Sequence, residues 1–253
     1  MSRYSFFLLL LLLLASCATK KDVLYFQDAT NLNLRNLNYS NAEIQIDDII
    51  NIKVTALNEE SVKPYNLDNG VAPNTSLIEV LKFQGYLVSK EGTIVFPILG
   101  KINVINKTTS ELENQIQKIL IDGDHVKDPT VSVRLLNSKF TILGEVNKAG
   151  TYTITENNLT VLQAIGYAGD LTINGSRKDV LIIRSKDGIQ QTKKIDLTKT
   201  DWFTSEFYFI KQNDVIVINP NNNKIKSSGF LGSASAVMSA ISLVLTSILI
   251  VTN

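Results

Sequence analysis

The C-terminal segment constrains this chain most, because it is apolar over the length of a membrane. Residues 230–251 (FLGSASAVMSAISLVLTSILIV) contain no charged side chain. A helix rises about 1.5 Å per residue, so a helix of this length matches the roughly 30 Å hydrocarbon core of a bilayer. Two lysines precede the segment and two polar residues follow it. The sequence therefore predicts a transmembrane helix over residues 230–251, joined to the rest of the chain by a linker at residues 221–229.

Hydroxyl side chains are not scattered through this segment. Ser235, Ser239, Ser242 and Thr246 are separated by four, three and four positions. On a helix this spacing places them within a stripe roughly 60° wide. Such a stripe suits a helix that packs against copies of itself, or one that faces water in a pore. Periodicity does not separate these two roles, and a single-pass anchor that tolerates small residues is the third interpretation.

The start of the chain has the features of a secretion signal. One arginine is followed by an unbroken apolar run at Phe6–Leu14, which is too short to span a bilayer. The run leads into a Leu-Ala-Ser-Cys sequence that ends at Cys17 and looks like a bacterial lipobox. We expect residues 1–16 to be removed, Cys17 to be acylated, for example with palmitate, and residues 17–43 to form a lipidated tether. The alternative is cleavage by the general signal peptidase, with Cys17 incidental.

Composition excludes several kinds of site. Cys17 is the only cysteine and His125 the only histidine, so the chain can form neither an internal disulfide nor a site of several cysteines or histidines, and we expect no metal. We also expect His125 to be exposed. Removal of the signal leaves 24 basic and 24 acidic residues from the 25 and 24 of the whole chain, which argues against a nucleic-acid partner.

No pattern points to catalysis. The sequence contains neither of the two common glycine-rich phosphate loops nor a Gly-x-Ser-x-Gly elbow, and we expect no cofactor and no catalytic residue. Adjacent carboxylates such as Asp47 and Asp48 would point to opposite faces of a strand. An enzyme acting on glycans through carboxylates remote in sequence is the weakest alternative. The aromatic cluster from Trp202 to Phe209 is expected in a core or a subunit interface more than on a sugar-binding surface.

The middle of the chain predicts an α+β fold in two units, at residues 44–137 and 138–220. Each mixes short β-branched strands with a helix. In the first unit we expect, in order, a strand at 48–57, a loop at 58–79, two runs flanking a turn at 89–92, a helix from Thr108 with a Glu111 capping box, and a strand at 130–136.

In the second unit we expect paired strands around the glycine-containing turn before Gly150, a helix at 159–168 ended by Gly169, a hairpin at 179–196, and a strand at 214–218. The sequences at 47–50 and 213–216 echo each other.

Ordered motifs along these units resemble the polysaccharide export outer-membrane lipoproteins, the Wza-like family. The second unit is similar to that family's soluble-ligand-binding (SLBB) β-grasp domain, with Ala149 where proline is typical. The sequence differs before the first strand, where Gln45-Ile46-Asp47 replaces the usual Gly-Pro-Gly. The positions that carry the resemblance are Asp48, Gly92, Pro97, Gly100, Gly144, Gly150 and Asp214.

This resemblance implies a function without chemistry. It implies a lipoprotein of the outer membrane whose domains lie in the periplasm, and which assembles into a homo-oligomeric ring. The tail helices of several copies would form an α-helical barrel, a porin-like channel that passes capsular or extracellular polysaccharide. The implied partners are the transported polysaccharide, copies of the chain, the lipid bilayer, and an inner-membrane co-polymerase/tyrosine kinase. The alternative is a doubly membrane-anchored periplasmic module that binds a glycan or a partner and forms no pore.

Overall fold

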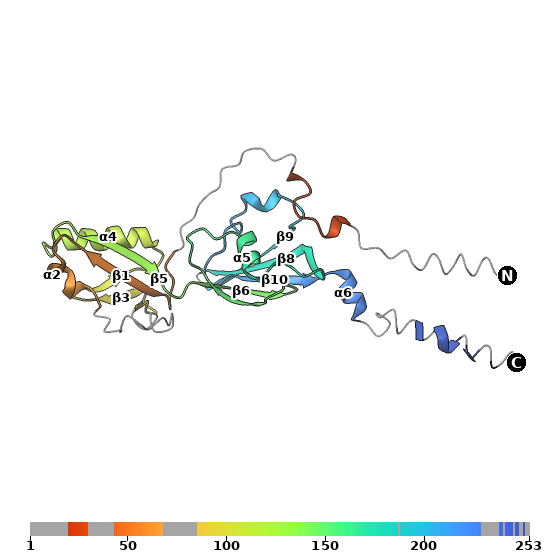
Figure 1. The fold of residues 1–253 in the computed structure, drawn as a ribbon. Coiled ribbons are helices and arrows are strands. Elements are labelled where there is room, and N and C mark those ends of the chain that lie inside the picture. The colour runs from red at the N-terminus through yellow and green to blue at the C-terminus, as the bar shows by residue number, and fades with distance from the viewer. Residues whose placement is uncertain are drawn as a thin grey trace.

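The computed structural model describes residues 20–29, 43–67, 85–186 and 188–228, and scattered positions of the C-terminal segment (238–239, 241–244, 246–247 and 250). These residues form two bodies, each with its own hydrophobic core, in an α+β arrangement. The first body occupies one side of Figure 1 and the second body the other. The mixture of helices and sheets expected from the sequence is confirmed.

The first domain packs one helix on a small antiparallel sheet. The sheet has the order β2 (Tyr86–Leu87), β1 (Ile49–Thr55), β5 (Thr130–Leu135), and the helix is α4 (Thr109–Asp122). Strand β1 alternates, so that Ile50, Ile52 and Val54 enter the core. Helix α4 begins with both hydrogen bonds of the predicted Thr108–Glu111 capping box, which satisfy two otherwise unpaired amides. Its buried face is Leu112, Ile116 and Leu120.

A second hairpin in this domain pairs different strands from those flanking the predicted turn. The turn at 89–92 forms, with the Gly92 N–H donating to the Ser89 carbonyl at 2.9 Å. However, strand β3 (Thr93–Phe96), which follows this turn, pairs with β4 (Gly100–Asn103) across the residues around Ile98. The β-rich runs indicate where strands lie but do not specify which strands pair.

The expected loop at 58–79 contains short helices at its start. Helix α2 (Glu59–Val62) is capped by the Asn58 side chain, which accepts a hydrogen bond from the Glu60 amide, and η3 (Lys63–Tyr65) follows it. Four residues are too few for a periodic signal, and the proline in η3 argued for a loop. The rest of the expected loop, from residue 68, lies outside the described residues.

In the part of the chain that the structure describes, the second domain contains a mixed sheet of five strands. The strand order is β7 (Gly150–Thr153), β6 (Lys139–Gly144), β10 (Val215–Pro220), β8 (Gly175–Lys186), β9 (Ile189–Ile195). Strands β6 and β10 are parallel, whereas the other neighbours are antiparallel. Helix α5 (Val161–Tyr167) starts with a Thr160–Gln163 capping box, and Gly169 follows it at φ +72° as expected for its stop. A short η4 (Asp201–Thr204) connects β9 to β10.

Residues 20–29, here called the strap, pack on the second domain instead of hanging free. The strap begins with η1 (Lys20–Asp22). Its backbone continues the hydrogen bonding of the domain, because the amides of Phe26 and Gln27 donate to the carbonyls of Leu197 and Thr198 at 3.1 and 2.7 Å. Part of the expected tether is therefore bound to a surface more than a hundred residues away in sequence. This packing was not predicted.

The C-terminal side of the second domain leads toward the apolar segment. Helix α6 (Asn222–Ser227) follows β10 directly and is capped by Asn221. Described positions from Met238 to Ile250 are helical and exposed. Within the described residues, no helix is both long and apolar enough to cross a membrane. Most of the predicted span at 230–251 lies outside those residues, and the transmembrane helix remains a prediction.

Candidate functional site

The residues predicted to attach the chain to the membrane or to form the hydroxyl stripe are only in part among the described residues. Cys17 and Ser235 lie outside the described residues. Ser239, Ser242 and Thr246 are helical and exposed, and the Thr246 hydroxyl donates to the Ser242 carbonyl at 2.8 Å. A hydroxyl bonded to the preceding turn of its own helix can enter an apolar environment without an unpaired donor.

Two of the predicted glycines are required by their surroundings. Gly92 has φ +72°, and a Cβ there would lie 2.6 Å from the Ile105 side chain. Gly144 ends β6 at φ +93°, where a Cβ would lie 2.1 Å from the carbonyl oxygen of Ile218 in β10. The other turn positions are Pro97, in the β3–β4 turn, Gly100, at the start of β4, and Gly150, at the start of β7. These positions shape turns and strand ends, and they bring no reactive group together.

The echoing sequences fold into the same local structure. Asp48 precedes β1 and accepts a hydrogen bond from the Gln45 amide at 2.8 Å, while Asp214 precedes β10 and accepts one from the Lys211 amide, also at 2.8 Å. The residue before each aspartate has a positive φ, 67° at Asp47 and 63° at Asn213. Both aspartates are buried, with 1% and 0% of their surfaces exposed. Each domain therefore has one buried carboxylate immediately before its central strand.

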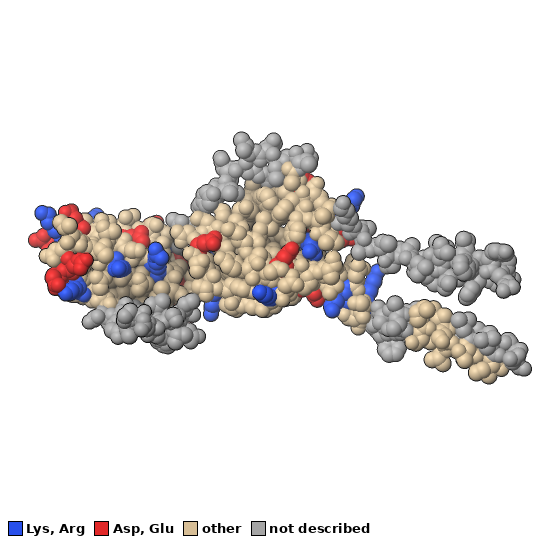
Figure 2. All heavy atoms as spheres, viewed as in Figure 1, with Lys and Arg blue, Asp and Glu red and all other residues tan. Residues whose placement is uncertain are grey.

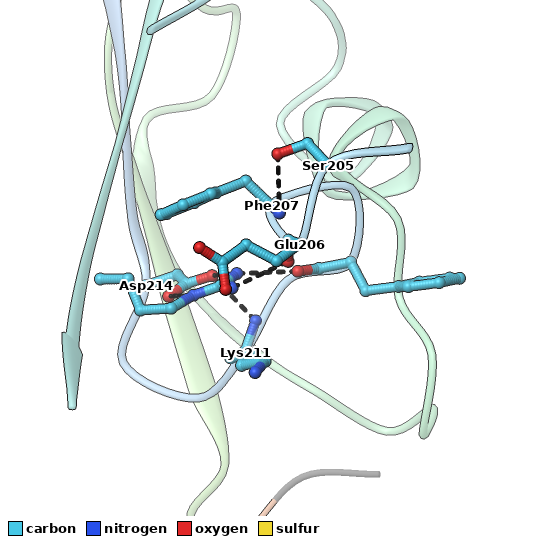
Figure 3. A network of polar contacts seen from close by, with 7 residues as sticks. Ser205, Glu206, Phe207, Lys211 and Asp214 are labelled. Carbon is cyan, nitrogen blue, oxygen red and sulfur yellow. Dashed lines mark hydrogen bonds and ion pairs between the residues drawn. The ribbon is translucent and has the colours of Figure 1, made fainter. Parts of the chain in front are cut away.

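Asp214 forms a buried ion pair with Arg184 of β8. The Arg184 Nε and Nη2 atoms donate to the two carboxylate oxygens at 2.9 and 2.7 Å. Figure 3 shows this carboxylate enclosed by the loop that carries Glu206 and Phe207. The guanidinium also donates to the carbonyls of Glu206 and Phe209 and lies 4.5 Å from the centre of the Phe207 ring. One arginine therefore holds the loop before β10 against the sheet.

Burial and charge act against each other in this pair. Burial raises the pKa of Asp214, although the Arg184 guanidinium and the Lys211 amide favour the ionised carboxylate. Burial, together with the cationic Arg184 and Lys186, lowers the pKa of Lys211. The four oxygen atoms that accept from the guanidinium, two of the Asp214 carboxylate and two backbone carbonyls, all belong to this domain. The arrangement is that of a structural clamp.

Asp48 has no such cation. Its second oxygen accepts a hydrogen bond from the Gln212 side chain, which is 4% exposed and belongs to the turn before Asp214. No lysine or arginine in the described part of the chain forms an ion pair with Asp48. Burial raises the pKa of Asp48, and the hydrogen bonds from Gln45 and Gln212 only partly oppose this effect. The two echoing turns thus meet each other directly.

Further contacts complete this junction between the domains. Lys186 of β8 pairs with Glu43, which lies before the first strand, at 2.8 Å. Asn137, in the connection between β5 and β6, accepts from the Ile49 amide and donates to the Asp47 carbonyl, both at 2.9 Å. The connection between the domains is therefore fixed by hydrogen bonds to the start of β1.

The strap places an aromatic side chain between two charged residues of the second domain. The Tyr25 hydroxyl donates to the Asp170 carboxylate, and the Arg177 guanidinium carbon lies 5.3 Å from the Tyr25 ring centre. Phe26 packs edge-on against Phe203 at 5.4 Å between ring centres. Two polar contacts flank these rings, because Lys178 pairs with Asp22 at 2.6 Å and Thr200 donates to Asp28. Burial and the Asp170 carboxylate raise the pKa of Tyr25 above its ordinary value.

The aromatic cluster belongs mainly to the core, as predicted. Trp202, Phe207 and Phe209 are buried, and the Trp202 indole N–H donates to the Lys199 carbonyl at 3.0 Å. Buried rings of this kind offer no stacking surface for a sugar. His125 is exposed, as expected, and among the described residues no cluster of three or more histidine, cysteine or carboxylate side chains could hold a metal.

Sequence reasoning named Asp48 and Asp214 as motif positions but predicted neither their burial nor their partners. Arg184 and Gln212 carry no local signal, because each acts on a residue brought close only by the folded sheet. The strap was missed for the same reason. The echo of 47–50 in 213–216 was the available clue that the two turns are built alike.

Comparison with known proteins matches two successive regions of the chain. Residues 37–136 match the family model described as polysaccharide biosynthesis/export protein, and residues 138–218 match the SLBB domain. The chain is 26% identical over 159 residues to the EPS I polysaccharide export outer membrane protein EpsA of Ralstonia solanacearum, a match that covers 61% of this chain and 41% of the relative. It is 34% identical over 104 residues to the protein of that name in Ralstonia nicotianae, covering 40% and 27%. The chain thus matches less than half the length of these relatives.

Proposed function

We propose that this chain, which belongs to the polysaccharide biosynthesis/export family in its Wza-like form, exports polysaccharide across the outer membrane. The observation that carries the proposal is the order of the two matched regions, an export region at 37–136 followed directly by an SLBB domain at 138–218. The printed names of both relatives add support, since each is called a polysaccharide export outer membrane protein.

The finer part of the proposal concerns anchoring. After removal of residues 1–16, an acyl group on Cys17 holds each copy at the periplasmic face of the membrane. The globular part consists of an export domain at 44–137 and an SLBB domain at 138–220. The tail at 230–251 then crosses the outer membrane as a helix. The position of the sole cysteine after an apolar run and the absence of charge in the tail support this topology.

The assembled state follows from the size of the cargo. One helix encloses no pore, so transport of a hydrated polymer requires several tails arranged as a barrel. A closed homo-oligomeric ring supplies them, with each subunit contacting its neighbours through two different faces. The hydroxyl stripe from Ser235 to Thr246 faces the lumen or the next helix in such a barrel.

Transport through this ring needs no chemistry by the chain itself. The lumen passes a capsular or extracellular polysaccharide by size and weak polar contact. The driving force comes from polymer synthesis and from an inner-membrane co-polymerase/tyrosine kinase. The clamp and turns described above serve the shape of each subunit.

The first test is the mass and shape of the acylated full-length protein in mild detergent, by light scattering and single-particle imaging. We expect a ring with a central opening, and we expect the opening to be lost when residues 230–253 are deleted. A stable monomer or dimer with an intact tail would contradict the channel. That result would favour the doubly anchored module that binds a glycan or a partner.

Export itself is tested in cells that lack the gene. Full-length protein should restore surface or released polysaccharide, whereas the 230–253 deletion should not, at equal protein levels. Export that survives this deletion would contradict a barrel made of tails. Turnover of isolated glycan by the protein would instead indicate an enzyme.

A further inference from the structure

Both routes from the second domain toward the membrane leave it at one end. Helix α6, which leads to the tail, and η1, which leads back toward Cys17, lie at the end of this domain that faces away from the first domain (Figure 1). The residues between α5 and β8 lie at the same end, since β8 begins beside the end of β10. We call the loop 171–174 together with α6 the end surface.

Hydrogen bonds tie both routes to the region of this surface. The Asn221 amide donates to the Asn174 carbonyl at 2.7 Å, and its side chain donates to the Ile173 carbonyl at 2.9 Å. On the strap side, Tyr25 binds Asp170, and Asp22 pairs with Lys178. Residues 170–178 are therefore contacted by the strap as well as by the base of the tail.

Chain length keeps both attachment points close to the end surface. Cys17 precedes Asp22, whose side chain pairs with Lys178, by five residues, which span at most about 18 Å. Phe230, where the uncharged segment begins, follows Ser228 by two residues, or at most about 7 Å. A lipid on Cys17 and a tail that starts at Phe230 leave little room between this end of the domain and a bilayer.

The side chains exposed there combine apolar groups with cations. Ile173 is 68% exposed and Ile225 is 57% exposed. Lys224 and Lys226 lie in the last turn of α6 and are exposed, and Figure 2 shows blue spheres where α6 lies in Figure 1. In the headgroup region of a bilayer, ammonium groups meet phosphates while nearby apolar side chains reach the acyl boundary. In water, the exposure of these two apolar side chains contributes no favourable free energy.

We propose that Ile173, Ile225, Lys224 and Lys226 form a membrane-contacting surface that seats the second domain directly on the phospholipid headgroups. The proposal rests on the proposed function, because it takes the acyl group on Cys17 and the tail as membrane-bound. The first domain then points away from the bilayer. A lipid surface is favoured over a second copy because both covalent routes to the membrane converge at this end, whatever the number of subunits.

The experiment uses full-length acylated protein in nanodiscs of phosphatidylethanolamine and phosphatidylglycerol. Since the only native cysteine carries the lipid, Ile173→Cys introduces the only free thiol for a nitroxide label. We expect the label to be several-fold more accessible to oxygen relative to a water-soluble nickel complex than a matched label at Val95→Cys. Val95 is a suitable control because it is 67% exposed and lies in β3 of the first domain.

A second variant tests the cations. Replacing Lys224 and Lys226 by glutamate should lower the oxygen accessibility at position 173 and should leave the assembly size unchanged. A label at 173 that is as water-accessible as the one at 95 would overturn the proposal. Spin–spin broadening between labels at 173, present equally in detergent and in nanodiscs, would also overturn it, by indicating a second copy as occupant.

Two readouts on the same sample separate this proposal from the proposed function. The intact mass reports acylation of Cys17, and imaging reports the ring. An acylated ring with a water-exposed Ile173 refutes the membrane contact and leaves export untouched. An unacylated Cys17 removes the anchor, and it refutes both the lipid-anchored topology and the inference that depends on it.

Discussion

At the scale of single residues, the carboxylates of two buried aspartates are compensated by different partners. Asp48 and Asp214 occupy the same kind of turn, and each accepts a hydrogen bond from the amide three residues earlier. Asp214 is further compensated by the Arg184 cation, whereas Asp48 has only the neutral Gln212 amide. Because a buried carboxylate without a cation disfavours its charged form, the two positions should respond differently to substitution.

Asp48→Asn should be tolerated or stabilising near neutral pH, by up to about 1 kcal/mol. The Asn oxygen can accept from Gln45, and the Gln212 amide can turn so that its unpaired Oε1 accepts from the new Nδ2. The pKa of Asp48 is raised in the fold, so its contribution to stability is full below the unfolded pKa near 4 and is lost as pH rises through the folded pKa. Urea unfolding from pH 4 to 7 should show the mutant gaining on the native protein as pH rises. A difference that does not change with pH would contradict this assignment.

Removing one partner of the Arg184–Asp214 pair should be severe. Asp214→Ala leaves a buried guanidinium without its carboxylate, and we expect the free energy of unfolding to fall by about 3–5 kcal/mol. In a double-mutant cycle, Arg184→Ala and Asp214→Ala together should lose less than the sum of the two single losses. Lys63→Ala is the control, because its pair with Glu60 is exposed and worth at most about 1 kcal/mol. Strict additivity in the cycle would mean that the pair is not coupled.

At the scale of elements, local sequence signals predicted where a helix starts and where a strand lies, but not which elements pack together. Thr108 and Glu111 determine where α4 begins, so its start was predictable, and the β-branched residues of β1 predicted a strand there. Strand pairing was not predictable in this way. Strand β3 pairs with β4, and no single residue specifies which neighbouring strand it pairs with. The strap is the extreme case. Its contacts lie 145 to 177 positions away, and its sequence has little periodicity.

Tyr25 should hold the strap on the second domain. Tyr25→Ala removes both the ring under Arg177 and the hydrogen bond to Asp170, so the strap should detach more often. Hydrogen exchange of the Phe26 and Gln27 amides, which donate to Leu197 and Thr198, measures this opening. Tyr25→Phe loses only the hydrogen bond, and we expect exchange to rise by roughly tenfold, less than in the alanine variant. Unchanged exchange in both variants would contradict docking through Tyr25.

At the scale of the whole molecule, the two domains are joined by few contacts, of which the innermost is buried. Gln212 and Asp48 form the inner contact, Lys186 and Glu43 form a partly exposed ion pair, and Asn137 fixes the connecting chain. Interfaces of this limited kind usually allow relative motion of domains once a contact is lost. The angle between the domains should therefore depend on a handful of side chains.

Gln212→Ala combined with Lys186→Ala should loosen the junction without unfolding either domain. Each domain keeps its own core, so circular dichroism should remain native. Small-angle scattering should show a broader distribution of overall dimensions. Lys194→Ala is the matched control, because this lysine pairs with Asp179 inside the second domain. Equal scattering profiles for the double variant and the control would show that these contacts do not fix the domain angle.

The docking of the strap also sets an order of events during biogenesis. The strap leaves the ribosome first, but the surface that receives it is built from residues 170–200. At about 5–20 residues per second, on the order of 10 s of synthesis separates the two. Until then the residues after Cys17 have no partner from that surface. An enzyme that processes and acylates the cysteine during this interval would therefore meet a strap that is not yet docked, and docking would follow once the receiving surface has formed.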